Sequence, residues 1–597
     1  MLVLGISAFY HDSAAALVKD GKVIAAAQEE RFTRKKNDSG FPEHAISYCL
    51  DHAGVGINEM DLIGFYDKPL LTFDRLLETY LTYAPAGLES FVRSIPVWVK
   101  EKLLQKTTLT NGLNGLDRGK LDVEKLLFGF HHHSHAASAF YPSPFDEAAI
   151  IVMDGVGEWA TTTIGEGRGT KVNLLDEIRF PHSLGMLYSA FTYYLGFKVN
   201  EGEYKVMGLA PYGEPIFADR IRENLIDIKN DGSFRLRMEY FNYCTGLTMT
   251  NSKFHELFGG PPRNSAEPLA QRDMDLARSV QVITEEIVLA ICEGAYQKTG
   301  LKNLCLAGGV ALNCVANGRI LRESSFDNIW IQPAAGDAGA SLGVALALSH
   351  DVGETGRDRS LSSSDQMFGT YLGPSFEQAD IETVLQSYNA IYRSVGDDEL
   401  YEFVASSLAD EKIVGWFQGR MEFGPRALGN RSILGDPRSE RMQSMLNLKI
   451  KYRESFRPFA PAVLCEDVGE YFELEGESPY MLLVADVREE RRHALEGDAI
   501  QAKGLDKLRI PRSDVPAVTH VDNSARVQTV SRSTNPRFHQ LLEAFKAKSG
   551  CSVLVNTSFN VRDEPIVCTP EDAYRCFMAT EMDILIVGNT ILIKEEQ

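Results

Sequence analysis

The sequence lacks a CxxC pair, a long apolar run and an excess of positive charge. Its nine cysteines are scattered, and an odd number without paired spacing suits a reducing cytoplasm better than a disulfide framework. The sequence contains no run of about eighteen apolar residues, which a membrane-spanning helix would require. The 61 basic and 82 acidic residues give a net charge of −21, which argues against a nucleic-acid partner and against docking on an anionic membrane. A phosphate-binding site in this chain must therefore be a local concentration of basic residues.

The N-terminus also lacks the features of an export signal. No basic segment precedes its apolar residues, and His11-Asp12 interrupts them, so we expect no signal peptide and a cytoplasmic protein. Low-complexity segments and short repeats are absent as well. What remains is an ordinary globular composition, with 44% hydrophobic and 24% charged residues over 597 positions. That length allows about four domain-sized units.

Four of the thirteen histidines lie within residues 131–135. The small apolar residues that follow favour a helix, and two prolines shortly afterwards end it. On a helix, His131 and His135 are an i, i+4 pair whose imidazoles project from one face. An apolar strand at 148–153 then ends at Asp154. Two imidazoles and a carboxylate predict a metal site, and a histidine-rich loop without a ligand is the alternative.

Two strand–turn–strand units lie far apart in the chain. Residues 1–28 predict three strands, and the turn at 19–22 joins the last two as a hairpin. A polar turn with His11 near its end follows the first strand. Residues 148–164 repeat the strand–turn–strand pattern, as a duplicated actin-like ATPase fold would require. The charged residues 29–36 predict a solvated face, with contact to a substrate as the alternative.

Three glycine-containing segments are candidates for ligand contact, since glycine lets the backbone approach a ligand and a helix N-terminus attracts anions. In the segment 303–313, a strand runs into Gly308-Gly309 and a helix start. In the segment 333–341, glycines flank Asp337 at a helix start, where a capping role is the alternative. The segment 203–213 has a lysine among glycines, and a plain connecting loop is equally consistent with it.

The character of the chain changes beyond a polar segment. Residues 353–370 predict a linker between a domain at 1–352 and a domain at 371–597. Residues 413–458 combine glycines with many arginines and lysines. In so acidic a chain, this concentration predicts a site for a phosphate or a carboxylate, and a salt-bridged surface is the alternative. A later strand ends at the polar residues 556–560, a common place for a site.

Ten motifs in this order resemble the O-carbamoyltransferases, which include the nodulation-factor, cephamycin, novobiocin and tobramycin carbamoylation enzymes. The resemblance covers nearly the whole chain. It implies an α/β protein with an actin-like (ASKHA) duplicated N-terminal domain, similar to the transferase subunit that makes threonylcarbamoyl-tRNA, and a YrdC-like α/β C-terminal domain. The motifs are LGISAFYHDSAAALV, QEERF, HHHSHAASAFYPSPF, MDGVGEW, EYKVMGLAPYG, AGGVALN, PAAGDAGASLG, GRMEFGPRALGNRSILGDPR, RESFRPFAPAV and LVNTSFN.

The resemblance also implies a reaction and its residues. Carbamoyl phosphate and ATP, with Mg²⁺, form carbamoyl-adenylate, and the carbamoyl group then passes to a hydroxyl of a small molecule or sugar. Fe(II), or another divalent transition metal, polarises the acyl group, and His11 takes the proton of the acceptor. By motif, the metal ligands are His131, His135, Asp154 and Asp337. The nucleotide-binding residues are Lys205, Gly308, Gly309 and Asn313, and the carbamoyl-phosphate-binding residues are Arg426, Lys451, Arg457, Arg526 and Asn556. His132 and His133 are not needed as ligands.

Two other classes stay open. An actin-like sugar or metabolite kinase would explain the first half of the chain but gives the basic second domain no role. A non-catalytic partner in tRNA threonylcarbamoylation would explain both folds. The net charge of −21 argues against a large tRNA-binding surface. The complete set of predicted metal ligands argues against a protein that has lost catalytic activity. A zinc protease is disfavoured because HHHSH lacks the glutamate of HExxH. The acceptor cannot be predicted from these motifs, and a homodimer is left open.

Overall fold

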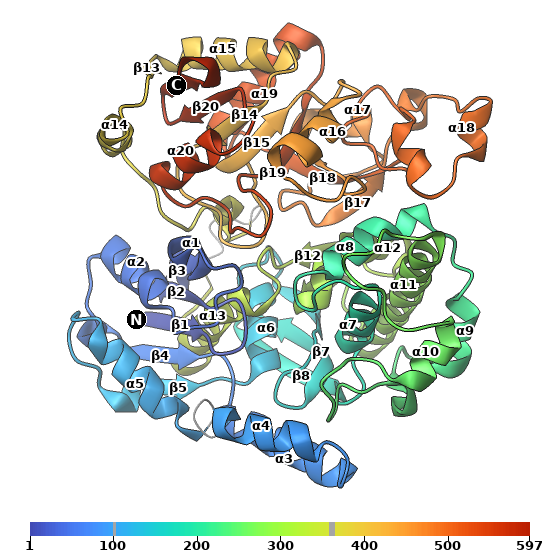
Figure 1. Ribbon diagram of the computed structural model, residues 1–597. Helices are drawn as coiled ribbons and strands as arrows, with labels where there is room; N and C mark the ends of the chain where they lie inside the picture. Colours follow the sequence, from blue (N-terminus) through green and yellow to red (C-terminus); the bar gives the residue numbers. More distant parts are fainter. Residues whose placement is uncertain (99–102, 358–364) are drawn as a thin grey trace. The chain divides into compact units, whose positions relative to one another are not determined.

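The computed structural model describes residues 1–98, 103–357 and 365–597 (Figure 1). The chain forms two compact units, one of residues 1–29 with 37–366 and one of residues 30–36 with 367–597. Residues 358–364 of the predicted linker lie outside the described residues, and the predicted domain boundaries at 352 and 371 stay a prediction. The short segment 30–36 therefore folds with the second unit, although the chain around it belongs to the first.

The first sheet of the first unit begins as an antiparallel meander. Its strands are β1 (Leu2–Ser7), β2 (Ala14–Lys19), β3 (Lys22–Gln28), β4 (Leu62–Phe65) and β5 (Leu126–Phe128). Their order is β3-β2-β1-β4-β5, with β2 antiparallel to both β1 and β3. Strand β4 is parallel to β1, and β5 is parallel to β4.

The second sheet of this unit repeats that topology. Its strands are β6 (Glu147–Met153), β7 (Ala160–Arg168), β8 (Lys171–Arg179), β11 (Asn303–Ala307) and β12 (Asn328–Ile331). Their order is β12-β11-β6-β7-β8, with an antiparallel β6-β7-β8 meander and β11 and β12 added in parallel. Two sheets with the same connections confirm the duplicated actin-like fold that the two strand–turn–strand units predict.

Two turns define the start of the chain. Between β2 and β3, Asp20 and Gly21 both have positive φ, at 50° and 77°, as a tight two-residue hairpin requires. The β1–β2 turn, residues 8–13, carries His11. Its main chain is fixed by two hydrogen bonds, from Phe9 N to the carbonyl of Ser39 (2.8 Å) and from Ser13 N to that of Asp38 (2.9 Å). The turn is thus held at both ends.

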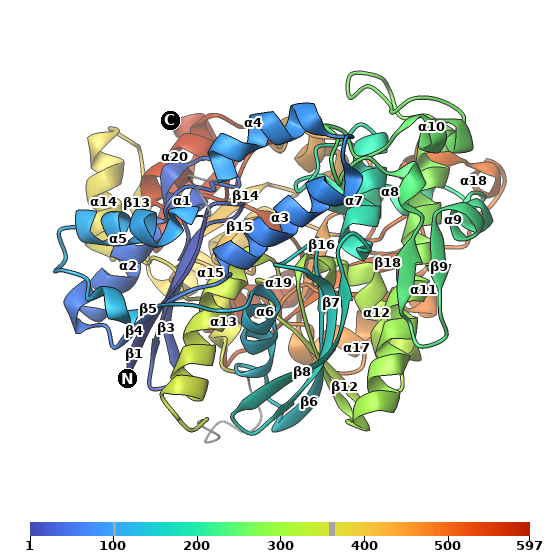
Figure 2. The same cartoon turned by 90° about the horizontal axis from the view of Figure 1, so that it is seen from below.

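Two helices lie side by side between the two sheets in both views (Figures 1 and 2). Helix α6 (His131–Phe140) packs on β6 and β11, and α13 (Asp337–Ala347) packs on β1 and β2 and against α6. A Cβ at Gly343 would lie 1.7 Å from the carbonyl oxygen of Ser134, so only glycine permits this close approach. The packing places the start of α13 beside the histidines of α6, and it makes one compact unit of both sheets.

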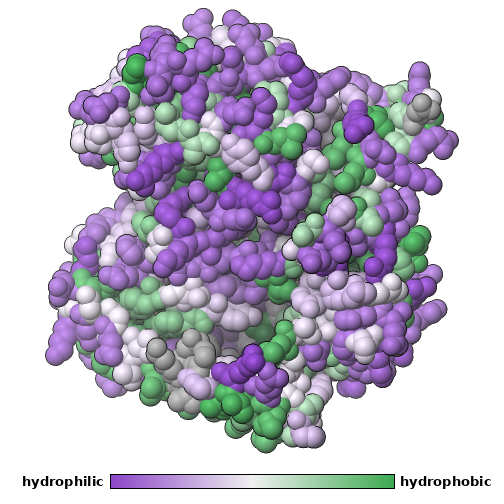
Figure 3. Space-filling view, viewed as in Figure 1, coloured by the Kyte–Doolittle hydropathy of each residue, from purple (hydrophilic) through white to green (hydrophobic). Residues whose placement is uncertain are grey.

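No helix within the described ranges is both long and apolar enough to cross a membrane. Hydrophilic side chains cover most of the face shown in Figure 3.

The remaining elements of the first unit surround the two sheets and the helices α6 and α13. The helices are α2 (Glu43–Ala53), α3 (Pro69–Tyr83), α4 (Leu88–Trp98), α5 (Gln105–Gly115), α7 (Leu184–Tyr194), α8 (Glu203–Leu209), α9 (Ala218–Asn224), α10 (Ser252–Phe258), α11 (Gln271–Thr299) and α12 (Cys314–Glu323), with a hairpin of β9 (Ile226–Ile228) and β10 (Phe234–Leu236).

The second unit is an α/β domain built on one mixed sheet, as predicted, and its likeness to YrdC stays a prediction. The strands are β13 (Arg393–Ser394), β14 (Val414–Phe417), β15 (Arg431–Gly435), β16 (Ala460–Leu464), β17 (Leu483–Asp486), β18 (Ser524–Val530), β19 (Val553–Ser558), β20 (Ile584–Val587) and β21 (Thr590–Ile593). Their order is β13-β21-β20-β14-β15-β19-β16-β18-β17. The helices are α1 (Glu30–Thr33), α14 (Gln378–Ser387), α15 (Asp397–Ala409), α16 (Met442–Met445), α17 (Val468–Tyr471), α18 (Asp498–Gln501), α19 (Pro536–Ser549) and α20 (Pro570–Met578).

The predicted solvated face at residues 29–36 is wrong for its first three members. Glu29, Glu30 and Arg31 are only 2%, 6% and 4% exposed. The carboxylate of Glu29 accepts hydrogen bonds from the backbone N–H groups of His44 (3.2 Å) and Ala45 (2.9 Å) at the start of α2. A helix N-terminus favours such an anion, and this contact explains why Glu29 is buried.

Candidate functional site

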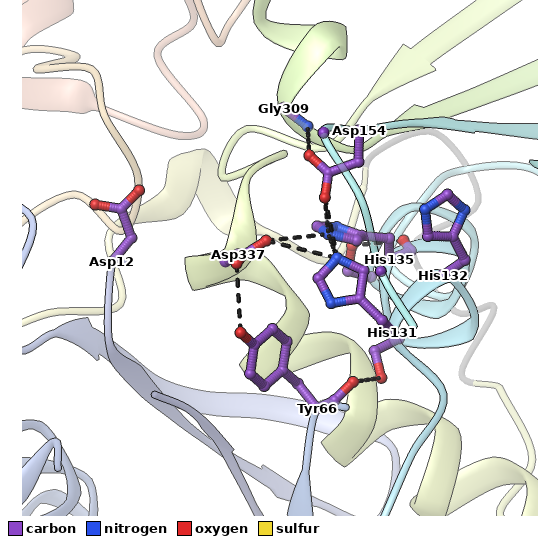
Figure 4. A network of polar contacts seen from close by, with 12 residues as sticks. Asp12, Tyr66, His131, His132, His135, Asp154, Gly309 and Asp337 are labelled. Atoms are coloured by element: carbon purple, nitrogen blue, oxygen red, sulfur yellow. Dashed lines mark hydrogen bonds and ion pairs between the residues drawn. The ribbon is translucent and has the colours of Figure 1, made fainter. Parts of the chain in front are cut away.

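The four predicted metal ligands converge in the first unit (Figure 4). One ligand atom from each of His131, His135, Asp154 and Asp337 lies within 4.8 Å of all the others. Nε2 of His131 is 3.0 Å from Oδ2 of Asp154 and 3.2 Å from Nε2 of His135. Nε2 of His135 is 3.5 Å from Oδ1 of Asp337. Side chains from a helix, a strand end and a second helix start therefore meet at one point.

Local structure orients each ligand. His131 and His135 lie one turn apart on α6, as the i, i+4 spacing predicts. Asp154 directly follows β6, and its Oδ1 accepts a hydrogen bond from the backbone N–H of Gly309 at 3.0 Å. Asp337 is the first residue of α13, and the cap residue before it is Gly336. Asp337 therefore stands one position inside the helix and is not its N-cap residue, so the capping alternative does not account for it.

The electrostatics of this cluster favour a bound cation. Burial raises the pKa of Asp154, but hydrogen bonds from His131 and His135 hold it well below its usual value. Burial lowers the pKa of His135, yet the carboxylates of Asp154 and Asp337 outweigh it and raise the pKa to about 9. Two imidazole nitrogens that face each other and two carboxylates need positive charge between them. Four nitrogen and oxygen donors without a thiolate suit a divalent first-row cation.

The two neighbouring histidines stand outside the cluster. Nδ1 of His132 is 2.6 Å from the hydroxyl of Thr163 on β7, and its ring points away from the four ligands in Figure 4. Burial and the nearby His131 lower the pKa of His132 well below its usual value. Nε2 of His133 lies 3.7 Å from a carboxylate oxygen of Asp351. Both side chains have other partners, and their exclusion as ligands stays a prediction.

We therefore expect His132→Ala to keep its metal content. The change removes the contact with Thr163 and should lower the free energy of unfolding by about 1–3 kcal/mol, because a buried hydroxyl loses its partner. Elemental analysis of protein purified without oxygen, alongside thermal unfolding, checks both parts. If His132→Ala loses the metal while His131→Ala retains it, the ligand assignment is wrong.

Some of the predicted nucleotide-binding residues lie near the cluster of the four predicted metal ligands. Gly308 has φ of 87°, and a Cβ there would lie 2.2 Å from the carbonyl oxygen of Met153, so glycine alone allows the turn after β11 to touch the end of β6. Asn313 caps α12 through a bond from Ala316 N (3.1 Å). Lys205 lies on α8 with its ammonium 5.7 Å from the ring centre of Phe197. The hydrogen bond from Gly309 to Asp154 links the glycine turn directly to the cluster.

His11 adjoins the cluster from the β1–β2 turn. Its Nε2 lies 3.8 Å from Oδ2 of Asp337, and its side chain is 24% exposed. Burial lowers the pKa of His11, but the charge of Asp337 and a hydrogen bond and charge from Asp12 raise it to about 10. The structure thus places the predicted base beside a predicted ligand and within reach of solvent.

The predicted carbamoyl-phosphate site gathers around the end of β19 in the second unit. Asn556 on β19 donates from Nδ2 to the carbonyl of Ala427 at 3.1 Å, which holds the loop that carries Arg426. Lys451 is 2% exposed, and its ammonium donates to Ser558 and Asn560 beyond the strand. Burial and the nearby Arg453 lower the pKa of Lys451 well below its usual value. The ammonium group of Lys451 thus holds the carboxyl end of β19 through its hydrogen bonds.

The other two predicted residues lie on neighbouring segments. Arg526 is on β18, two residues before Gln528 and so on the same face of the strand. The amide of Asn556 also contacts Gln528 at 2.6 Å. Arg457 closes a turn through a hydrogen bond from its N–H to the carbonyl of Glu454 at 3.3 Å, and its guanidinium lies 3.7 Å from the carboxylate of Glu454. Arg526 and Asn556 thus lie on strands of the same sheet that are separated only by β16, and the roles of all five residues stay a prediction.

Three residues beside the four predicted metal ligands make contacts that sequence reasoning missed. The hydroxyl of Tyr66 donates to Oδ2 of Asp337 at 3.4 Å. The carboxylate of Glu158 accepts from His131 N (2.9 Å) and from Lys68 N (3.0 Å), and Arg75 donates to the carbonyl of Gly157. Glu158 stands in the MDGVGEW motif, which could have drawn attention to it. Tyr66 and Arg75 stand in no comparable pattern.

The whole chain is similar to proteins of one family. Family models of the carbamoyltransferase N-terminus and C-terminus match residues 2–346 and 405–594. The uncharacterized protein sll1178 of Synechocystis is 62% identical over 598 residues, which covers 100% of this chain and 97% of that protein. Nodulation protein NolNO of Sinorhizobium fredii is 37% identical over 98% of this chain and 79% of its own length. The 3'-hydroxymethylcephem-O-carbamoyltransferase of Amycolatopsis lactamdurans is 34% identical over 52% of each protein. Full-length HypF in its phosphate- and nucleotide-bound form aligns with 59% of this chain and 55% of its own, at 12% identity and a TM-score of 0.30.

Proposed function

The chain belongs to the carbamoyltransferase family, and we propose that it is an ATP-dependent O-carbamoyltransferase. The second unit converts carbamoyl phosphate and ATP, with Mg²⁺, to carbamoyl-adenylate. The first unit transfers the carbamoyl group to a hydroxyl of a small-molecule or sugar acceptor. The observation that carries this proposal is the convergence of four cation ligands beside the Gly308-Gly309 turn, because it joins a cation site to a turn suited to a nucleotide.

Activation takes up one water. Water cleaves the acyl phosphate to carbamate and phosphate, and a carbamate oxygen then attacks the α-phosphorus of ATP. Pyrophosphate leaves with the electrons of the broken P–O bond. The substrates are multiply charged anions, for which guanidinium forks are suited. The bond from Asn556 to Ala427 supports this assignment, because it holds the Arg426 loop at the end of β19.

His131, His135, Asp154 and Asp337 hold one divalent transition metal, which we take to be Fe(II). When bound, this cation would supply positive charge that stabilises the negative charge developing in the transfer step. The chain keeps the ligands in place through their outer atoms, as outer-shell partners of metal sites do. Gly309 N holds the second oxygen of Asp154, and the hydroxyl of Tyr66 donates to Asp337.

His11 takes the proton of the acceptor. The acceptor oxygen attacks the carbonyl carbon of the adenylate, AMP leaves, and the hydroxyl proton passes to the imidazole. With Asp337 and Asp12 raising the pKa of His11 to about 10, the ring accepts a proton near neutral pH only when part of this negative charge is offset. A cation on Asp337 meets that requirement.

We expect His11→Ala to separate the two half-reactions. The variant should accumulate carbamoyl-adenylate while the carbamoylated product forms about 10²–10⁴-fold more slowly, because a general base typically contributes that much. Rapid quench and chromatography of the adenylate and product measure both rates. His52→Ala, at an exposed histidine on α2, is the matched control. Turnover of His11→Ala near the wild-type rate would remove this residue from the mechanism.

The acceptor is identified by a screen. Candidate alcohols are incubated with the protein, carbamoyl phosphate and ATP, and mass spectrometry detects the gain of one carbamoyl group. We propose that the reaction takes place in the cytoplasm, since all nine cysteines are free thiols and a reducing compartment suits them. Phosphorylation of an acceptor instead of carbamoylation would point to a kinase and contradict the proposal.

A further inference from the structure

A short N-terminal segment is built into the second unit. Residues 30–36, which contain α1, fold with residues 367–597 and not with the strand that precedes them. Phe32 packs on a buried cluster of Met421, Ala427, Ile566 and Cys568. Two of these residues belong to the loop that carries Arg426, and two lie beyond the end of β19. The segment therefore contacts both loops that flank the proposed carbamoyl-phosphate site.

Arg31 binds the first of these loops. Its side chain is 4% exposed, and Nη2 donates to the carbonyl oxygen of Gly424 at 2.8 Å. Nη1 lies 2.9 Å from the carboxylate of Glu30, which balances the buried charge. Gly424 is two residues before Arg426 in the chain. The guanidinium thus fixes the main chain immediately before the predicted phosphate ligand.

Arg34 binds the second loop. Its Nη1 donates to the carbonyl of Ile566 at 2.7 Å, and its Nη2 donates to that of Pro565 at 2.8 Å. Its Nε is 3.5 Å from Asp572 at the start of α20. Two parallel donors from one rigid group fit two successive carbonyls, which an ammonium cannot match. This loop continues from Asn560, one of the partners of Lys451.

We propose that Arg31 and Arg34 are positioning residues for the carbamoyl-phosphate site, an inference that rests on the proposed function. Neither guanidinium is assigned to the substrate. Each holds a loop through backbone carbonyls, and the two loops carry or adjoin Arg426, Lys451 and Asn556. A binding site for a small dianion needs its donors fixed within a fraction of an ångström. The second unit is complete only with this N-terminal segment.

The test compares activation with transfer in the full-length chain. Arg31→Ala and Arg34→Ala should raise KM for carbamoyl phosphate in adenylate formation by about tenfold or more, as loss of a charge-assisted hydrogen bond does. Transfer from supplied carbamoyl-adenylate should stay within about twofold. Arg34→Lys retains one donor and should fall between wild type and Arg34→Ala. Arg532→Ala, an exposed arginine of the same unit paired with Glu543, should change neither value.

Amide hydrogen exchange supplies a readout that does not depend on the reaction. Both alanine variants should speed exchange in residues 421–431 or 559–568 by about tenfold, because the loops open locally. If wild type makes no adenylate, the proposed function fails, and the exchange data still decide whether the arginines hold the loops. Unchanged exchange, an unchanged KM, or an equal loss of transfer from supplied adenylate would overturn the inference.

Discussion

Replacing His131 or Asp337 with alanine is expected to abolish both the bound transition metal and carbamoyl transfer. Each residue supplies one of four donor atoms that lie within 4.8 Å of one another. Loss of an outer-shell partner already costs about 10–100-fold in metal affinity, so loss of a ligand should cost at least about 100-fold. Elemental analysis of anaerobically purified protein and a transfer assay with supplied carbamoyl-adenylate measure the two effects.

The adjacent histidines provide the controls for this experiment. His132 and His133 share the same helix but contact Thr163 and Asp351 instead, and their alanine variants should retain the metal. The design thus separates a ligand role from a general need for histidine on α6. Wild-type protein without any metal under anaerobic conditions, or full metal content in Asp337→Ala, would show that the four residues serve another purpose.

Replacing Arg426 with alanine is expected to stop activation and spare transfer. The change removes a charge-assisted contact to carbamoyl phosphate and leaves part of the bound phosphate unpaired, at a cost of roughly 2–4 kcal/mol. The variant should fail with carbamoyl phosphate and ATP but should transfer the carbamoyl group when carbamoyl-adenylate is supplied. His131→Ala should form no carbamoylated product from either source of the carbamoyl group, because His131 is a predicted metal ligand of the transfer site.

This pair of variants decides whether activation and transfer have separate sites. Arg426 lies in the second unit and His131 in the first. If Arg426→Ala is equally inactive with supplied carbamoyl-adenylate, both steps share one site. If both variants make adenylate at the wild-type rate, the assignment of carbamoyl-phosphate binding to Arg426 is wrong.

Local patterns in the sequence predicted the helices and the strand that position the four predicted metal ligands. The i, i+4 histidines predicted the shared helix face, and α6 runs from His131 to Phe140 as expected. The apolar run before Asp154 predicted β6. These features depend on neighbours in the chain, which a sequence pattern records. Asp337 was placed at a helix start for the same reason, and its side chain joins the cluster.

Contacts between distant segments were not predictable in this way. The hydroxyl of Tyr66 reaches Asp337 across 271 positions, and Glu158 joins the starts of α3 and α6. No local spacing encodes such pairs, because the packing of two sheets around α6 and α13 brings them together. The charged residues 29–36 led to a wrong prediction of solvent exposure for their first three members. Their composition favours solvent, but Glu29 caps α2 and Arg31 binds a carbonyl of the second unit.

Carbamoyl-adenylate formation is the central claim, and one measurement tests it directly. The full-length protein is incubated with ATP, Mg²⁺ and carbamoyl phosphate labelled with heavy carbon, without an acceptor, and the products are followed by phosphorus NMR and mass spectrometry. We predict labelled carbamoyl-adenylate together with equal amounts of pyrophosphate and phosphate. Formation of ADP, or ATP consumption that does not depend on carbamoyl phosphate, would contradict the account.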